Sequence, residues 1–78
     1  MIGGVERLSQ TDRERLGRNI SRLRNRLGFS QEELAERSVI QARYLQRIEA
    51  GEYGGSVAVL KRIRRELKAE WNEILDGL

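Results

Sequence analysis

The sequence predicts an all-α domain, in which five short helices pack as an orthogonal bundle. Apolar residues recur at helical spacing through most of the 78 residues, and no stretch alternates as a strand would. The chain has no proline, and its glycines fall mostly between the periodic stretches. Residue types that cap helices stand before several of these stretches. We therefore expect one helical domain over residues 11–78, preceded by an N-terminal arm over residues 1–10.

The first helix is predicted to begin at Thr11, whose residue type caps helix N-termini. Glu14 stands three residues later, as a capping box requires. Gly28 is expected to end the helix. The apolar residues between these points recur on one helix face, and they are Leu16, Ile20, Leu23 and Leu27.

The second helix is predicted over residues 31–37, with Ser30 as its N-cap and Glu33 at the capping-box position. Leu34 and Ala35 form its buried side. Residues 38–40 form a tight connection to the next helix.

The third helix is predicted over about residues 41–50, and Gly51 is suited to end it. Leu45 and Ile48 lie on its buried side. Two short helices joined by a tight connection form the helix-turn-helix arrangement, which we centre on residues 30–50.

Two further helices complete the predicted bundle. Ser56 follows the glycine pair of the preceding loop and is expected to cap the fourth helix. The fourth helix carries the apolar stripe Leu60, Ile63 and Leu67, and a short fifth helix over about residues 70–76 carries Trp71, Ile74 and Leu75.

The composition narrows the possible functions. The net charge is +3 with 13 arginines, and residues 1–50 hold the whole positive excess. Arginine suits phosphate and guanine recognition because its planar fork donates two parallel hydrogen bonds. A solvated helical surface would also explain a charge excess of this size.

The absence of Cys and His removes disulfides, the usual zinc sites and the usual nucleophile–base pairs, so we expect no metal, no cofactor and no enzyme. No apolar run approaches a membrane span or a signal peptide, so we expect a cytoplasmic protein.

The third helix has a polar side that is suited to a DNA groove. Arg43 and Arg47 are four residues apart and point the same way, opposite to Leu45 and Ile48. Arginine pairs with guanine and glutamine with adenine in the major groove. From this helix alone, base reading and an ordinary solvated face are both open. The base-reading candidates by this argument are Gln41, Arg43, Gln46 and Arg47.

Two segments of the chain resemble a known family. The runs LGFSQEELAER at residues 27–37 and YLQRIEAG at residues 44–51 resemble the lambda-repressor/Cro-like (XRE-type) helix-turn-helix family. The resemblance covers about residues 16–75. It implies a five-helix DNA-binding domain. The positions that continue the match beyond the motif are Ser56, Leu60, Ile63, Leu67, Trp71 and Leu75.

The resemblance also implies roles for individual residues. Ala42 occupies a common base-reading position, where it offers only a methyl group. Arg24 and Glu49 match a buried ion pair between the first and third helices of the family, so Arg24 is expected to be structural. The residues expected to contact DNA phosphates are Ser30, Gln31, Tyr44 and Ser56.

Three positions depart from the family pattern. Val39 stands where the family usually has glycine, and a β-branched residue at positive φ is costly, so the turn is expected to be strained or to differ locally. Gln41 replaces the usual capping residue of the third helix. Arg64 replaces a core alanine, so its side chain must reach outward along its aliphatic stem or serve an interface.

The function predicted from these observations is transcription regulation by binding a palindromic operator in double-stranded DNA as a homodimer. The length suits a controller protein of a restriction–modification system, with phage Cro-type repressors and antitoxins as alternatives. A protein-interaction module that uses the same fold without reading DNA is the alternative from a different class. The residues expected at the dimer interface are Trp71, Ile74, Leu75 and Leu78.

Overall fold

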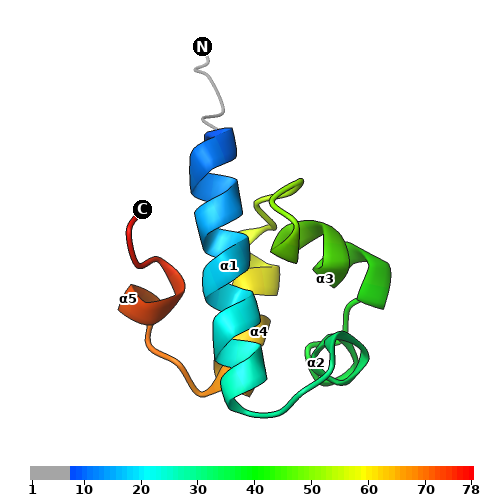
Figure 1. The fold of residues 1–78 in the computed structure, drawn as a ribbon. Helices are drawn as coiled ribbons and strands as arrows, with labels where there is room; N and C mark the ends of the chain where they lie inside the picture. The colour runs from blue at the N-terminus through cyan, green and yellow to red at the C-terminus, as the bar shows by residue number, and fades with distance from the viewer. Residues whose placement is uncertain (1–7) are drawn as a thin grey trace.

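The computed structural model describes residues 8–78, which form five α-helices and no strand (Figure 1). The all-α prediction is therefore confirmed for this part of the chain. Most of the predicted N-terminal arm lies outside the described residues. The helices are α1 (Gln10–Arg26), α2 (Gln31–Arg37), α3 (Ala42–Glu49), α4 (Val57–Leu67) and α5 (Trp71–Ile74).

The predicted N-cap of α1 is wrong by two residues. Ser9 caps the helix, because its hydroxyl accepts a hydrogen bond of 3.1 Å from the backbone N–H of Asp12. Glu14 does not close a capping box with Thr11; instead its carboxylate accepts from the side chain of Gln10 at 3.2 Å. Serine is a stronger N-cap than threonine, so the helix begins at the earlier of the two candidates.

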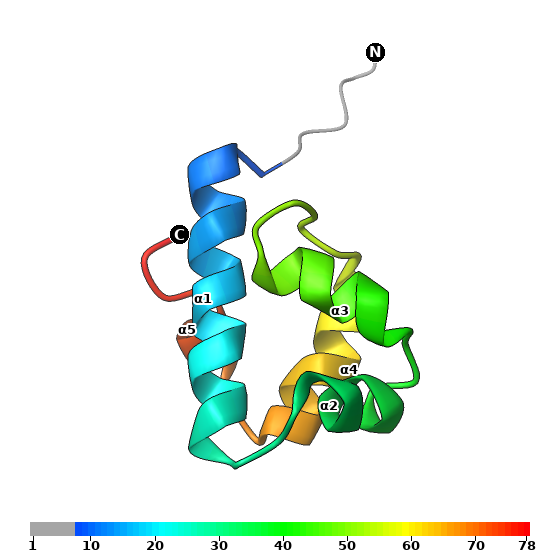
Figure 2. The same cartoon turned by 45° about the vertical axis from the view of Figure 1, so that its right-hand side comes forward.

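The core lies between α1 on one side and α2, α3 and α4 on the other (Figure 2). Every apolar position that the sequence assigned to the inner sides of α1 to α4 is buried, except Leu27, which is 38% exposed. The buried core residues are Leu16, Ile20, Leu23, Leu34, Ala35, Leu45, Ile48, Val59, Leu60, Ile63, Leu67, Ala69 and Ile74.

Helices α1 and α3 approach each other closely at Gly17. A Cβ atom at this position would lie 2.5 Å from the carbonyl oxygens of both Ile48 and Glu49. No side chain fits there without a backbone shift, so Gly17 fixes the distance between the longest helix and α3.

The second helix and its turn follow the prediction. Ser30 and Glu33 form the expected capping box, with reciprocal hydrogen bonds of 3.0 Å. In the turn, Val39 adopts φ 56°, in the left-handed region that disfavours β-branched residues. Its backbone N–H donates to Glu36 at 3.1 Å, and that of Ile40 donates to Ala35 at 3.0 Å. These bonds hold the strained residue in place between α2 and α3.

The last two helices complete the bundle, and the second of them is hydrogen-bonded to α1. Ser56 caps α4 as predicted, with its hydroxyl 3.1 Å from the backbone nitrogen of Val59. The fifth helix is shorter than the predicted 70–76. Asn19 of α1 is buried, and its side-chain amide donates to the carbonyls of Ile74 and Asp76 at 2.9 Å each. This contact places α5 on the side of α1 away from α3 (Figure 1).

Candidate nucleic-acid interface

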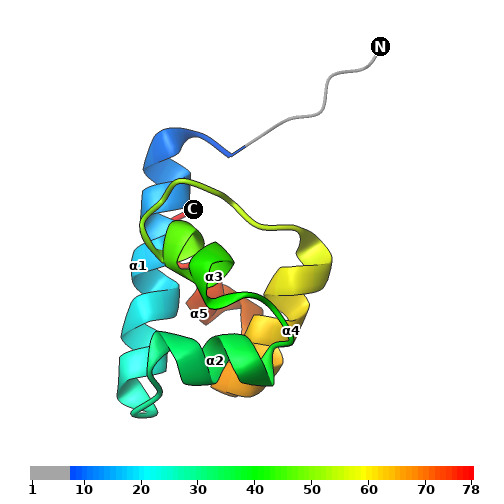
Figure 3. The ribbon, with the colours of Figure 1, turned by 90° about the vertical axis from the view of Figure 1, so that its right-hand side faces the viewer.

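The helix-turn-helix consists of α2, the turn 38–40 and α3. Figure 3 shows these two helices next to each other, with α4 beside them. Leu45 and Ile48 of α3 are fully buried, whereas Gln41, Arg43 and Gln46 are exposed. Helix α3 therefore has one face in the core and one face open to a partner.

An ion pair locks the C-terminal end of α3 to α1. Arg24 donates from Nε and Nη2 to the two carboxylate oxygens of Glu49, at 2.8 and 2.9 Å. The exposed fractions of the two side chains are only 12% and 5%. Arg24 also donates to the carbonyl of Phe29 at 2.8 Å, and its hydrogen bonds to Glu49 raise the pKa of the guanidinium. These are the two residues that the family resemblance pairs between the first and third helices.

Gln31 is joined to this ion pair. Its side-chain amide donates to Glu49 at 3.1 Å, and the residue is half-buried at the first position of α2. The first backbone N–H groups of a helix have no partner within it. Gln31 therefore lies at a fixed position beside donors that can face an anion.

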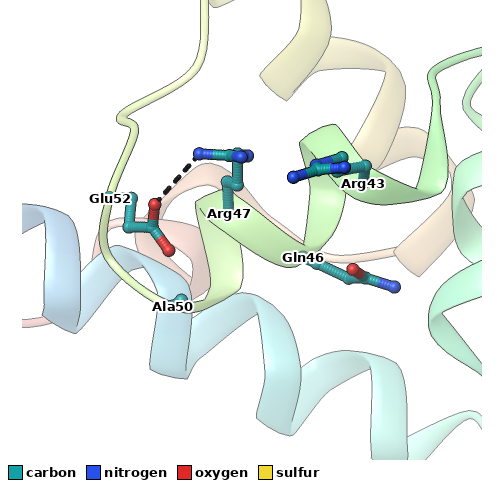
Figure 4. A pocket seen from close by; sticks show the side chains of 5 residues that line it. All are labelled: Arg43, Gln46, Arg47, Ala50 and Glu52. Atoms are coloured by element: carbon teal, nitrogen blue, oxygen red, sulfur yellow. Dashed lines mark hydrogen bonds and ion pairs between the residues drawn. The ribbon is translucent and has the colours of Figure 1, made fainter.

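The exposed face of α3 borders a hollow of about 470 Å³, shown in Figure 4. Arg43 and Arg47 project from one side of the helix, and Gln46 projects from another. The remaining two predicted base-reading residues, Gln41 and Ala42, do not line this hollow. Gln41 is the N-cap but makes no capping bond with its side chain, and Ala42 is half-buried against the core. The hollow is lined by Arg43, Gln46, Arg47, Ala50 and Glu52.

Two residues beside Arg47 were not predicted from the sequence. Glu52 accepts a hydrogen bond from Arg47 Nη1 at 3.3 Å, and the ring centroid of Tyr53 lies 5.7 Å from Arg47 Cζ. The ring of Tyr53 is also 6.0 Å from that of Tyr44. Glu52 and Tyr53 lie in a loop, where helical periodicity gives no information about side-chain direction.

The other predicted phosphate contacts have local roles in the free protein. The Ser30 and Ser56 hydroxyls each accept from a backbone N–H as N-caps, and both residues are exposed. Each hydroxyl retains its proton to donate. Tyr44 is half-buried and packs against the core.

One of the residues predicted at the dimer interface is not on the C-terminal surface. Ile74 has 0% exposure, so it is a core residue and we remove it from the expected dimer interface. Trp71, Leu75 and Leu78 are exposed. Arg64 is half-buried: its guanidinium lies 5.4 Å from the Trp71 ring centroid and donates to the Ala69 carbonyl at 3.0 Å.

The fold and this surface define a helix-turn-helix protein of the DNA-binding type. The Helix-turn-helix family model HTH_3 matches residues 20–74, more than half of the chain. The chain belongs to this family, in agreement with the XRE-type resemblance of its sequence.

Solved structures with this fold include several regulators. The restriction–modification controller protein C.AhdI from Aeromonas hydrophila is 28% identical, with a TM-score of 0.79 over 82% of this chain and 97% of its own. The clp gene regulator ClgR from Corynebacterium glutamicum is 28% identical, with a TM-score of 0.78 over 90% of this chain and 72% of its own. SinR, a master regulator for biofilm formation solved in complex with DNA, is 29% identical, with a TM-score of 0.73 over 78% of this chain and 98% of its own.

No curated protein matches the sequence. Among residues 8–78, no helix combines the length and the apolar character that crossing a bilayer requires.

Proposed function

We propose that the chain regulates transcription in the cytoplasm by binding a palindromic operator in double-stranded DNA as a homodimer. The observation that carries the proposal is the division of α3 into two faces. Leu45 and Ile48 anchor one face in the core, while Arg43, Gln46 and Arg47 project from the helix around the hollow. A helix with this arrangement can enter the major groove and present its polar side chains to base edges.

Each polar residue has a role in this proposal. Arg43 and Arg47 read guanines, and Gln46 reads adenine, with Gln41 and the Ala42 methyl group at the start of the helix. Gln31 and the backbone N–H groups at the start of α2 bind phosphate, as do Ser30, Tyr44 and Ser56. The phosphate contacts set the position of the protein, and the base contacts set its sequence preference.

The dimer is proposed to form through the C-terminal surface. Trp71, Leu75 and Leu78 expose apolar atoms that a second copy would cover. One helix-turn-helix covers one half-site, so a symmetric dimer would span two half-sites about one helical turn apart. Sedimentation at tens of micromolar should show a species of twice the 9.0 kDa chain mass. A Trp71→Ala/Leu75→Ala double variant should sediment as a monomer.

The regulated system proposed is restriction–modification control. The similarity to C.AhdI supports it, because that controller protein matches over 97% of its own length. Phage-type repressors and antitoxins are the alternatives within the same mechanism.

Selection from a random pool of duplexes tests the proposed function. The purified chain should enrich one sequence with two symmetric halves. Enrichment of a single half-site would contradict the dimer, and failure to enrich any sequence would favour a protein-interaction module.

A further inference from the structure

Arg47 differs from Arg43 in what surrounds it. In the free protein Arg47 Nη1 is held by the Glu52 carboxylate at 3.3 Å, and Tyr53 lies beside the guanidinium. Arg43 is exposed and makes no ion pair with any residue of 8–78. Figure 4 shows Arg47 directed toward Glu52.

We propose that Glu52 is a specificity-determining residue that acts through Arg47. It holds the guanidinium in one orientation over the exposed face of α3, so that Arg47 reads a base instead of closing onto a phosphate. This inference rests on the proposed DNA-binding function and adds to it a residue outside α3.

The donor geometry permits both contacts at once. A guanidinium has five N–H donors, and guanine recognition uses two of them. The bond to Glu52 engages Nη1, whereas the described residues accept no hydrogen bond from Nε or Nη2 of Arg47. That edge of the fork is available to the O6 and N7 acceptors of a guanine.

The strength of the ion pair suits a positioning role. The side chains of Arg47 and Glu52 are 36% and 56% exposed, and an ion pair this exposed contributes little to folding. Removing it therefore leaves the fold intact. It does free a long, flexible cation near the phosphate backbone, where any DNA sequence offers it an acceptor.

The experiment compares Glu52→Gln with wild type by titration of two duplexes, one selected by the wild-type protein and one scrambled. The measured quantity is the ratio of the two affinities. A change in overall charge alters both affinities alike and largely cancels in this ratio. Glu52→Gln should bind the scrambled duplex about three- to tenfold more tightly, and its ratio should fall by a similar factor. Its salt dependence on the scrambled duplex should steepen by about one unit, because Arg47 gains a phosphate contact.

Two further variants identify the cause. Glu66→Gln makes the same charge change in the last turn of α4, where Glu66 has no ion pair within residues 8–78, and it should leave the ratio unchanged. In an Arg47→Ala background, Glu52→Gln should have no further effect on the ratio, because the residue it positions is gone.

The outcomes separate this inference from the function on which it rests. Wild type that discriminates the selected duplex, with an unchanged ratio in Glu52→Gln, overturns the role of Glu52 alone. A ratio that falls equally with and without Arg47 also overturns it. Wild type that prefers no sequence overturns both the role of Glu52 and the proposed function.

Discussion

The two faces of α3 are held in opposite ways. On the inner face, Leu45 and Ile48 are fully buried, and Glu49 accepts hydrogen bonds from Arg24 and Gln31. On the outer face, Arg43 has no ion pair within the described residues, and the contacts of Arg47 are exposed. Eight residues therefore carry both a rigid attachment to the domain and a set of adaptable donors.

This difference separates stability from recognition within one helix. The inner face positions the outer one, because its contacts with α1 fix how α3 is oriented. Changes to the inner face should lower the free energy of unfolding, and changes to the outer face should leave folding intact and alter binding.

The largest expected effect comes from Arg24→Ala. It leaves Glu49 buried with only Gln31 as a side-chain donor, so the free energy of unfolding should fall by about 3 kcal/mol. The midpoint of thermal unfolding should fall by about 4–8 °C for each kcal/mol. Arg24→Lys keeps the charge but not the two-donor geometry. Its free energy of unfolding should lie between those of the wild type and Arg24→Ala. Unchanged thermal unfolding with weaker DNA binding would mean that Arg24 contacts DNA. It would contradict the assignment of stability to the inner face of α3.

Gly17→Ala tests the close approach of α1 and α3. The added Cβ would meet the Ile48 and Glu49 carbonyl oxygens at 2.5 Å, so the helices must separate. Overpacking of this kind costs about 1–3 kcal/mol. Alanine would raise the helix propensity of α1 by about 1 kcal/mol, so the net change should be a loss of up to about 2 kcal/mol. Arg18→Ala, at an exposed position of the same helix, is the control and should be nearly neutral in urea denaturation. A more stable Gly17→Ala variant would contradict the close approach.

Val39→Gly changes the turn without touching either face of α3. Val39 is 74% exposed and holds φ 56°, so its replacement relieves backbone strain and loses little packing. A non-glycine residue in this region costs about 1–2 kcal/mol, part of which the greater entropy of unfolded glycine offsets. We expect a gain of about 0.5–1 kcal/mol, measured by urea denaturation. A loss of stability would show that the valine side chain contributes more than its conformation costs.

Acid should weaken the caps of α2 and α5. Backbone N–H donors at Ser30 and Glu70 hold the pKa values of Glu33 and Glu73, respectively, below the ordinary 4.5. Because the folded pKa is the lower one, this stabilisation is fully present above the unfolded pKa and is lost as pH falls through the folded pKa. Thermal unfolding should therefore shift to lower temperature below about pH 4.5. A Glu33→Gln/Glu73→Gln variant should show a smaller shift, and an identical acid profile would contradict this assignment.

The sequence predicts features that depend on local residue types. Ser30 and Ser56 were identified as caps because capping needs a short oxygen-bearing side chain at a helix start. The Arg24–Glu49 ion pair followed from the family pattern. The same pattern left open whether Val39 is strained or the turn differs locally, and the structure gives the strained φ. The start of α1 was misplaced because Ser9 and Thr11 are both capping types, two residues apart.

The missed features depend on contacts between distant segments. Gly17 resembles an ordinary helix-weakening glycine until the backbone of α3 is placed against it. Asn19 lies on the apolar face of α1 between Leu16 and Leu23, and that position was the one available signal that its amide is buried. The contact between Arg47 and Glu52 depends on the path of a loop, which no periodicity encodes.

The most direct test of base reading by the outer face is the titration of Arg43→Ala against the selected and scrambled duplexes at several salt concentrations. Arg43 has no ion pair within the described residues, so its loss should leave thermal unfolding unchanged. Affinity for the selected duplex should fall by about 1–3 kcal/mol, with a much smaller loss on the scrambled duplex. Gln31→Ala, as the matched phosphate-contact variant, should weaken both duplexes about equally with little change in salt dependence. Equal losses on both duplexes for Arg43→Ala, with a salt slope reduced by about one unit, would make Arg43 a phosphate contact and contradict base reading by this residue.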